Sequence, residues 1–226
     1  METLTPTRIT TPTAVPTMSS TPGRRAFGVL RIAASAVLIA ALTTQIIDLI
    51  ANHALVPREY FAYFTIESSF FNIVVLAIGG VLSLKHRFDP TGFTMVRIAI
   101  VTYAIVTGAV YNLLLRGGPP GDYVGPQWPN EVMHVWIPLF ILLDWLLAPG
   151  RPAIRWSALW LIVSYPVVWA AATLIRGAIT GWYPYPFLEP DGAAGYLGVV
   201  EYIAGLSLFI VALGIAGIAL SRRRKP

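Results

Sequence analysis

Residues 61–83 read FAYFTIESSFFNIVVLAIGGVLS, a run in which Glu67 is the only charged side chain. A helix rises about 1.5 Å per residue, so roughly 20 apolar residues are needed to cross about 30 Å of bilayer hydrocarbon. Five further stretches have the same length and character. The sequence therefore predicts an all-α polytopic membrane bundle of six transmembrane helices, at residues 28–50, 61–83, 94–115, 131–148, 155–176 and 196–220.

The composition agrees with this class of protein. Hydrophobic residues make up 56% of the chain and charged residues 12%, whereas soluble domains have about 25% charged residues. The net charge of +5 arises from basic residues in short loops and at the termini, which is typical of membrane topology, so we expect no nucleic-acid partner. The absence of cysteine excludes disulfides and thiolate-bound metals.

The distribution of charge predicts the orientation and the domains. Positive residues favour the cytoplasmic side, and most of the loop and terminal arginines and lysines fall on one side, so both termini should be cytoplasmic. We expect a multi-pass protein of the cell membrane. Its predicted parts are a disordered Thr/Pro-rich cytoplasmic tail at 1–23, the six-helix transmembrane domain at 24–221 and a basic cytoplasmic tail at 222–226.

An uncharged polar stripe begins the second span. Thr65, Ser68, Ser69 and Asn72 follow the i, i+3, i+4, i+7 rule, so they share one helix face that must turn towards protein rather than lipid. Such residues serve either as contacts between helices or as part of a site. Glu67 lies on another face and needs a partner of its own.

The fourth span contains the only histidine placed inside a span, His134, with Asn130 and Glu131 one turn before it. Thr65 and His134 each lie about four residues below the same predicted membrane surface, at roughly 6 Å depth. We therefore expect the two side chains to face each other at about 3–5 Å, where an imidazole can take the hydroxyl proton. A packed, hydrogen-bonded histidine without catalytic function is the alternative.

Further polar residues cluster towards the same predicted outer side, and they indicate a polar pocket with an apolar base. Charges at this depth are expected to pair, so we predict that Arg176 pairs with Glu201 or with Asp48. Asp144 lies towards the opposite end. One intramembrane histidine and scattered carboxylates give no haem or zinc ligand pattern, so we expect no metal and no cofactor. The remaining outer-side residues are Tyr111 and Asn112.

Two predicted outer loops, 116–130 and 181–192, are rich in proline, glycine and aromatic residues. The second reads GWYPYPFLEPDG. Prolines stiffen such a segment, and its aromatic side chains suit the lipid headgroup region. The segment is either an interfacial belt or a lid over a site that opens among the acyl chains.

Three segments carry a family resemblance: TIESSFFN (65–72), NEVMHVWIPLFILLDWLL (130–147) and GWYPYPFLEP (181–190). They resemble bacterial proline-rich six-pass membrane proteins and, more distantly, the androgen-induced and androgen-dependent membrane proteins of animals. The animal proteins hydrolyse fatty acid esters of hydroxy fatty acids with a membrane threonine and histidine, which the resemblance places at Thr65 and His134. Glu131 departs from the family pattern, which commonly has histidine there.

We interpret the chain as an intramembrane hydrolase of lipid esters, with Thr65 as nucleophile and His134 as general base. Asn72, Asn130 or Ser68 are the expected oxyanion donors. The supporting or substrate-binding residues are Ser68, Ser69, Asn72, Asn112, Asn130, Glu131, Arg176 and Glu201. The expected partners are membrane lipids and the lipid ester, and the sequence identifies no protein partner. The alternative is a non-catalytic lipid-binding or transporter-like membrane protein.

The orientation can be tested with reporter fusions. Fusions after residue 25, within 84–93 and at the C-terminus should report the cytoplasm, because these segments carry the basic residues. Fusions within 116–129 and 181–192 should report the opposite side. A C-terminus outside the cytoplasm would contradict the six-span topology.

Overall fold

The computed structural model describes residues 19–117, 123–192 and 195–223. Residues 1–18 of the predicted disordered tail and residues 224–226 of the predicted basic tail lie outside these ranges. Part of the predicted loop 116–130 also lies outside them.

Within the described ranges, six helical units are long and apolar enough to cross a membrane. Each predicted span falls on one of them, and the predicted all-α fold class is confirmed. The short helices α2 (Pro57–Tyr60) and η3 (Pro186–Leu188) lie in connecting segments. The spanning units are α1 (Pro22–Ala51), α3 (Phe64–Lys85), α4 with η1 (Thr91–Val110 and Tyr111–Leu115), α5–η2–α6 (Gln127–Glu131, Val132–Trp136 and Ile137–Leu147), α7 (Ala158–Thr180) and α8 (Gly195–Arg223).

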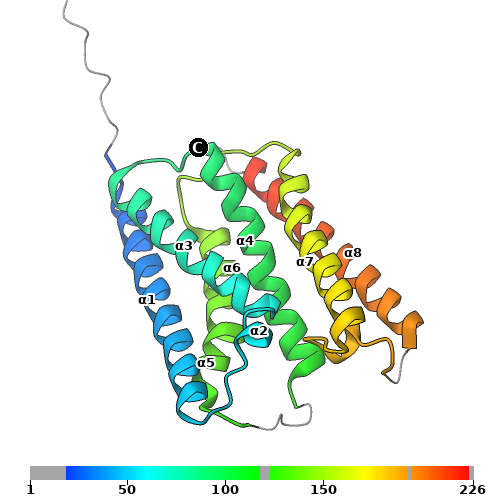
Figure 1. Cartoon of the computed structure of the whole chain (residues 1–226). Coiled ribbons are helices and arrows are strands. Elements are labelled where there is room, and N and C mark those ends of the chain that lie inside the picture. Colours follow the sequence, from blue (N-terminus) through cyan, green and yellow to red (C-terminus); the bar gives the residue numbers. More distant parts are fainter. Residues whose placement is uncertain (1–18, 118–122, 193–194, 224–226) are drawn as a thin grey trace, which may run out of the picture.

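Helix α4 occupies the centre of the bundle (Figure 1). It contacts α3, α6, α7 and α8, whereas α1 packs mainly against α3. The first described residues of α1 and the last of α8 lie at the same end of the bundle, as an even number of spans requires (Figure 1). We refer to this as the terminal end and to the other as the Thr65 end.

Small residues allow α1 and α3 to approach each other closely. A Cβ built on Gly28 would lie 3.0 Å from the carbonyl oxygen of Gly80, and one built on Gly80 would lie 3.0 Å from the carbonyl oxygen of Gly28. Helices in membranes commonly use glycine in this way, because packing replaces the hydrophobic drive between helices. Helix α3 thereby keeps its polar face directed into the bundle.

A cluster of buried charges joins three helices near the terminal end. Asp144 of α6 accepts hydrogen bonds from Arg31 of α1 at 2.9 Å and from Arg97 of α4 at 2.6 Å. Asp89, which precedes α4, bonds to Arg97 at 3.1 Å and to Arg24 at 2.6 Å. All five side chains are at most 4% exposed. The cluster connects α1, α4 and α6 through hydrogen-bonded charge pairs.

Sequence reasoning identified only Asp144 in this cluster. It overlooked Arg31 and Arg97, although both lie inside apolar helices, where an unpaired charge is expensive. Basic and acidic residues at similar depth in different spans indicate a buried ion pair, and this pattern would have identified Arg31 and Arg97 as partners of Asp144.

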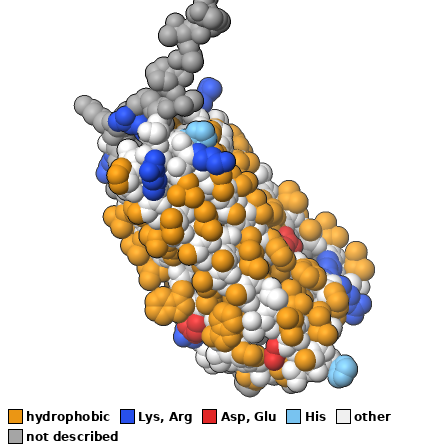
Figure 2. All heavy atoms as spheres, turned by 90° about the vertical axis from the view of Figure 1, so that its left-hand side faces the viewer, with side chains coloured by type: hydrophobic (Ala, Val, Ile, Leu, Met, Phe, Trp, Pro, Cys, Tyr) orange, Lys and Arg blue, Asp and Glu red, His pale blue; other side chains and the backbone are white. Residues whose placement is uncertain are grey.

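The outer surface of the bundle fits a bilayer. Hydrophobic side chains cover the middle of the visible face. Lysine and arginine side chains gather near its upper, terminal end, and a smaller group lies at the lower right (Figure 2). This distribution agrees with the sequence argument on orientation, and the assignment of that end to the cytoplasm stays a prediction.

Replacement of Asp144 by alanine should strongly destabilise the protein. Arg31 and Arg97 would both lose a buried carboxylate partner, and breaking a buried ion pair in this way costs about 3–5 kcal/mol. The measurement is the thermal unfolding midpoint of the purified protein in detergent micelles.

The matched control is Arg58→Ala. Arg58 pairs with Glu59 at 3.8 Å, and its side chain is 83% exposed, so its loss should change stability by less than about 1 kcal/mol. An Asp144→Ala protein as stable as Arg58→Ala would contradict a stabilising role for the charge cluster.

Candidate functional site

Thr65 lies in the first turn of α3, where the helix leaves backbone donors without helical partners. Tyr63 is the N-cap residue, and its carbonyl accepts the N–H groups of Ile66 and Glu67 at 3.0 and 3.2 Å. The N–H groups of Phe64 and Thr65 come before the first helical hydrogen bonds. The Thr65 side chain, 9% exposed, therefore sits beside two backbone donors at a buried helix start.

His134 lies in the π-helical turn η2, and its hydrogen bonds select one tautomer. Its Nδ1 is 2.9 Å from the carbonyl oxygen of Asn130. Because a carbonyl can only accept, we assign the ring proton to Nδ1, which leaves Nε2 as an acceptor. Single π-helical turns inside α-helices are frequent at functional sites.

The two side chains meet. Thr65 Oγ1 lies 3.2 Å from His134 Nε2, and both residues are buried. With the proton of His134 on Nδ1, the threonine hydroxyl donates to Nε2, which is the arrangement needed to activate a hydroxyl nucleophile. The distance expected from equal depth is confirmed, while a catalytic role stays a proposal.

A proline in the next turn determines how His134 is held. Pro138 has no N–H to donate to the carbonyl of His134, four residues earlier. The side-chain amide of Asn112 donates to that carbonyl at 3.1 Å and also to Gly108 at 2.8 Å. A Cβ on Gly108 would lie 2.9 Å from Pro138 Cβ, so glycine is needed for this close contact between α4 and the histidine helix.

Two more contacts fix the imidazole plane. The ring of Tyr111 stacks on His134 with centroids 4.1 Å apart and an interplanar angle of 23°. The Tyr111 hydroxyl in turn accepts the side-chain amide of Asn130 at 2.6 Å. Tyr111 thus connects η1, which continues α4, both to the imidazole and to the turn that orients it.

The predicted supporting residue Glu131 does not orient the imidazole directly. Both oxygens of its carboxylate accept from the same nitrogen of Arg116, Nη2, each at 2.8 Å. Arg116 also donates to Asn112 at 2.9 Å. Glu131 therefore acts on the site through Arg116 and Asn112, while the carbonyl of Asn130 orients His134.

Two of the three predicted oxyanion donors have other hydrogen-bond partners. The Ser68 hydroxyl donates to the carbonyl of Thr65 at 3.1 Å, and the Asn130 amide is bonded to Tyr111. Asn72 lies seven residues beyond Thr65, about 10 Å along the helix, and lines a small cavity with Arg31 and Asp144. The polar stripe therefore serves two regions of the bundle, with Ser69 buried between them.

The predicted pairing of Arg176 with Glu201 or Asp48 is not found among the described residues. The Arg176 guanidinium lies over the ring of Trp182 at 4.5 Å, and Asp48 accepts a hydrogen bond from Tyr123 at 2.8 Å. Glu201 is exposed on α8. Arg176 and Glu201 line neither of the cavities next to Thr65. Glu67 has found its expected partner, because the Tyr165 hydroxyl donates to it.

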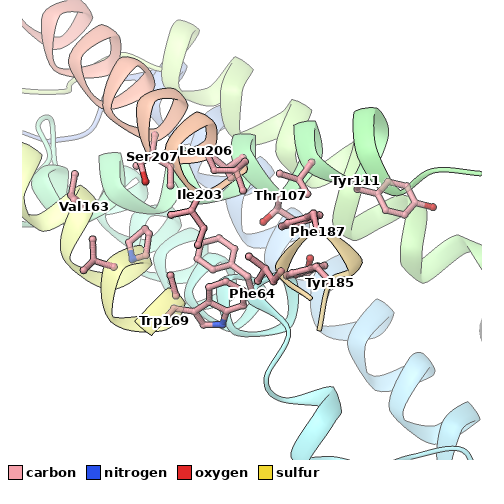
Figure 3. A pocket seen from close by; sticks show the side chains of 18 of the residues that line it. Phe64, Thr107, Tyr111, Val163, Trp169, Tyr185, Phe187, Ile203, Leu206 and Ser207 are labelled. Atoms are coloured by element: carbon pink, nitrogen blue, oxygen red, sulfur yellow. The ribbon is translucent and has the colours of Figure 1, made fainter. Parts of the chain in front are cut away.

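Two cavities meet at Thr65. One, of about 240 Å³, lies among α3, α4, α7 and α8 and is lined mostly by apolar side chains. The other, of about 290 Å³, is lined by residues of α1 and α3 and by His134. Four residues line both cavities: Thr65, Tyr111, Leu115 and Tyr185. Figure 3 shows the apolar cavity, with Ile203, Leu206 and Ser207 of α8 on one side. The hydroxyl of Thr65 is thus within reach of a molecule that enters either space.

Sequence reasoning missed the position of Tyr185. It placed this residue in an interfacial belt or a lid, whereas Tyr185 is 8% exposed and lines both cavities together with Thr65. Among the described residues, no group of three or more histidine, aspartate or glutamate side chains could hold a metal ion.

Comparison with known proteins adds a family likeness. The model of a family described as FAR-17a/AIG1-like protein matches residues 119–220. The matched region contains His134 and Tyr185 and does not include Thr65. No curated protein and no solved structure matches the chain.

The tautomer of His134 can be measured by nitrogen NMR on protein labelled in its histidines. The His134 signals, assigned by their loss in His134→Gln, should show a protonated Nδ1 and an unprotonated Nε2, because the Asn130 carbonyl accepts from Nδ1. A signal pattern with the proton on Nε2 would contradict the orientation in which Thr65 donates to the ring.

Proposed function

We propose that this protein hydrolyses lipid esters inside the membrane, with Thr65 as nucleophile and His134 as general base. The observation that carries the proposal is the 3.2 Å contact between Thr65 Oγ1 and an acceptor Nε2, at the junction of two cavities. The resemblance to a family that includes membrane hydrolases of fatty acid esters of hydroxy fatty acids supports this substrate class.

The reaction proceeds in two halves. Thr65 Oγ1 forms a bond to the ester carbonyl carbon while Nε2 of His134 takes the hydroxyl proton. Collapse of the tetrahedral intermediate breaks the bond to the alcohol oxygen, which leaves with that proton. Water then adds to the acylated Thr65, with Nε2 as base, and the fatty acid leaves as the proton returns to Oγ1.

The surroundings suit each step. The Nδ1 proton remains bonded to the carbonyl of Asn130 throughout, which holds the ring while Nε2 gains and loses its proton. The apolar cavity accommodates an acyl chain, and the second cavity accommodates the alcohol part of the ester. Within the proposed mechanism, the membrane lipids surround the enzyme, and the substrate enters from them.

The kinetic test compares single and double variants. Thr65→Ala and His134→Ala should each lower kcat by roughly 10³-fold or more, and the double variant should be scarcely slower, because residues that act as one unit are strongly non-additive. Thr65→Ser should retain part of the rate, since it keeps the hydroxyl. Release of free fatty acid from a fatty acid ester of a hydroxy fatty acid in mixed micelles is the measurement.

The control variant is Thr102→Ala. The Thr102 hydroxyl is buried and bonds to Ile98 within α4, away from both cavities, so its loss should leave kcat unchanged. Thermal unfolding of every variant separates catalytic effects from effects on stability. A well-folded Thr65→Ala protein with the wild-type rate would refute the nucleophile and favour a non-catalytic lipid-binding protein.

A further inference from the structure

The middle of α8 lacks the close packing of the rest of this helix. A helix that packs on a protein core buries a side chain about every three or four residues. The described residues 200–209 form a stretch about 15 Å long that includes no buried residue. The buried residues of α8 lie on either side of it: Gly198, Val199, Ile210, Gly214, Gly217, Ile218 and Ser221. This stretch therefore does not pack closely on a neighbouring helix.

The inward face of this stretch lines the apolar cavity instead. The cavity residues of α8 follow an i, i+3, i+4, i+7, i+8 pattern, which places them on one face of the helix. They are Ile203, Leu206, Ser207, Ile210 and Val211. Side chains of α7 line the same cavity (Figure 3), among them Val163, Pro166, Val167 and Trp169. The cavity thus extends between α7 and α8, from Thr65 towards the terminal end.

The space between α7 and α8 is closed at both of its ends. Towards the terminal end, a Cβ built on Gly214 would lie 2.9 Å from Leu159 Cδ1, so the two helices touch there. Towards the Thr65 end, the ring of Phe187 in the connecting segment lies 5.3 Å from the ring of Tyr202 in α8. An opening to the bilayer has to lie between these two contacts.

The cavity reaches the outer surface of the bundle at Val167 and Ser207. Both residues line the cavity, yet Val167 is 57% exposed and Ser207 is also exposed. Val167 lies eight residues from Leu159 in α7, and Ser207 lies seven residues from Gly214 in α8. In these antiparallel helices the two residues therefore lie at a similar depth, roughly 11 Å from the closed contact.

The position of this opening selects an acyl chain as the molecule that enters. Ser207 lies near the middle of α8, and apolar side chains surround the opening, with Val168 66% and Leu208 72% exposed. The opening therefore faces hydrocarbon, where charged groups are costly and lipid chains are abundant. From Ile203 to Val211 the cavity extends about 12 Å. One leaflet, half of the hydrocarbon core, is roughly 15 Å thick, so one acyl chain of an ordinary membrane lipid matches this length.

We propose that the gap between α7 and α8 at Val167 and Ser207 is a lateral entrance, through which one acyl chain passes from the bilayer into the apolar cavity. The ester group then lies at Thr65, and the end of the chain lies near Val163 and Val211, which limit its length. The position of the ester rests on the proposed function, whereas binding of the chain does not require hydrolysis.

Binding is tested without catalysis, in the Thr65→Ala protein. Palmitic acid with a diazirine in the middle of its chain is added to the protein in micelles and irradiated, and the labelled peptides are identified by mass spectrometry. Labelling should fall within 163–170 and 203–211, which contain the cavity residues of α7 and α8. An excess of unlabelled palmitic acid should suppress it.

The matched variants for this test are Ser207→Trp and Leu208→Trp. In Ser207→Trp the indole fills the entrance, so the labelling should fall several-fold. Leu208 is the next residue, lines no cavity next to Thr65 and is 72% exposed, so Leu208→Trp should leave the labelling unchanged. Labelling that neither unlabelled palmitic acid nor Ser207→Trp reduces would overturn the proposal.

The preference for acyl-chain length gives a second test. Val211→Trp fills the end of the cavity, so kcat/KM for a palmitoyl ester should fall roughly tenfold or more relative to a hexanoyl ester. Val163→Ala lengthens the space and should shift the preference towards longer chains, whereas Leu208→Trp should keep the wild-type ratio. A ratio that neither cavity variant changes would overturn the placement of the chain. A Thr65→Ala protein with the wild-type rate would instead refute the proposed function and leave the binding result standing.

Discussion

A polar group inside the membrane has to find its hydrogen-bond partner within the protein, because the hydrocarbon offers none. In two helices a proline lacks the N–H that would donate to the carbonyl four residues earlier, so another group must donate to it. Pro166 leaves the carbonyl of Ile162 without a helical donor, and the hydroxyl of Tyr103 donates to it at 3.0 Å. Pro138 likewise leaves the carbonyl of His134 without a helical donor, and the side-chain amide of Asn112 donates a hydrogen bond to it. Each such bond also fixes how two helices approach each other.

The site depends on that constraint. Because Asn112 must lie near the carbonyl of His134, α4 and the histidine helix come close enough for Tyr111 to stack on the imidazole. The start of α3 is also covered by protein, because the ring of Tyr185, from a segment more than one hundred residues later in the chain, meets the ring of Tyr63 at 5.6 Å. In a setting of low dielectric constant, such fixed dipoles act strongly on charge that develops during a reaction.

Hydropathy and helix periodicity were enough to predict the spans, the inward polar face of α3 and the meeting of Thr65 with His134. These features depend on spacing along single helices and on depth, which a sequence contains directly. Asn72 was predicted as an oxyanion donor, and the structure shows it lining a small cavity with Arg31 and Asp144, because one helix face can serve two regions at different depths. The prediction that these polar residues share one inward face of the helix was right. The sequence did not show that one end of this face lies at the site and the other end near the charge cluster.

Other features depend on how distant segments pack, which spacing does not encode. Arg31 and Arg97 are paired through Asp144 only because three helices bring them together. Arg176 has an aromatic neighbour, Trp182, in place of the expected carboxylate. The position of Tyr185 beside Thr65 depends on its proline-rich segment packing against Tyr63 at the start of α3.

The proposed reaction requires the Thr65 oxygen to be the nucleophile, and this is tested by identifying the atom that reacts. Purified protein in micelles is treated with a lipid-like fluorophosphonate and digested, and the modified peptide is located by mass spectrometry. We predict a single adduct on Thr65 that is absent in His134→Ala, since the hydroxyl needs its base. An adduct on another residue, or undiminished labelling of Thr65→Ala, would rule out Thr65 as the nucleophile.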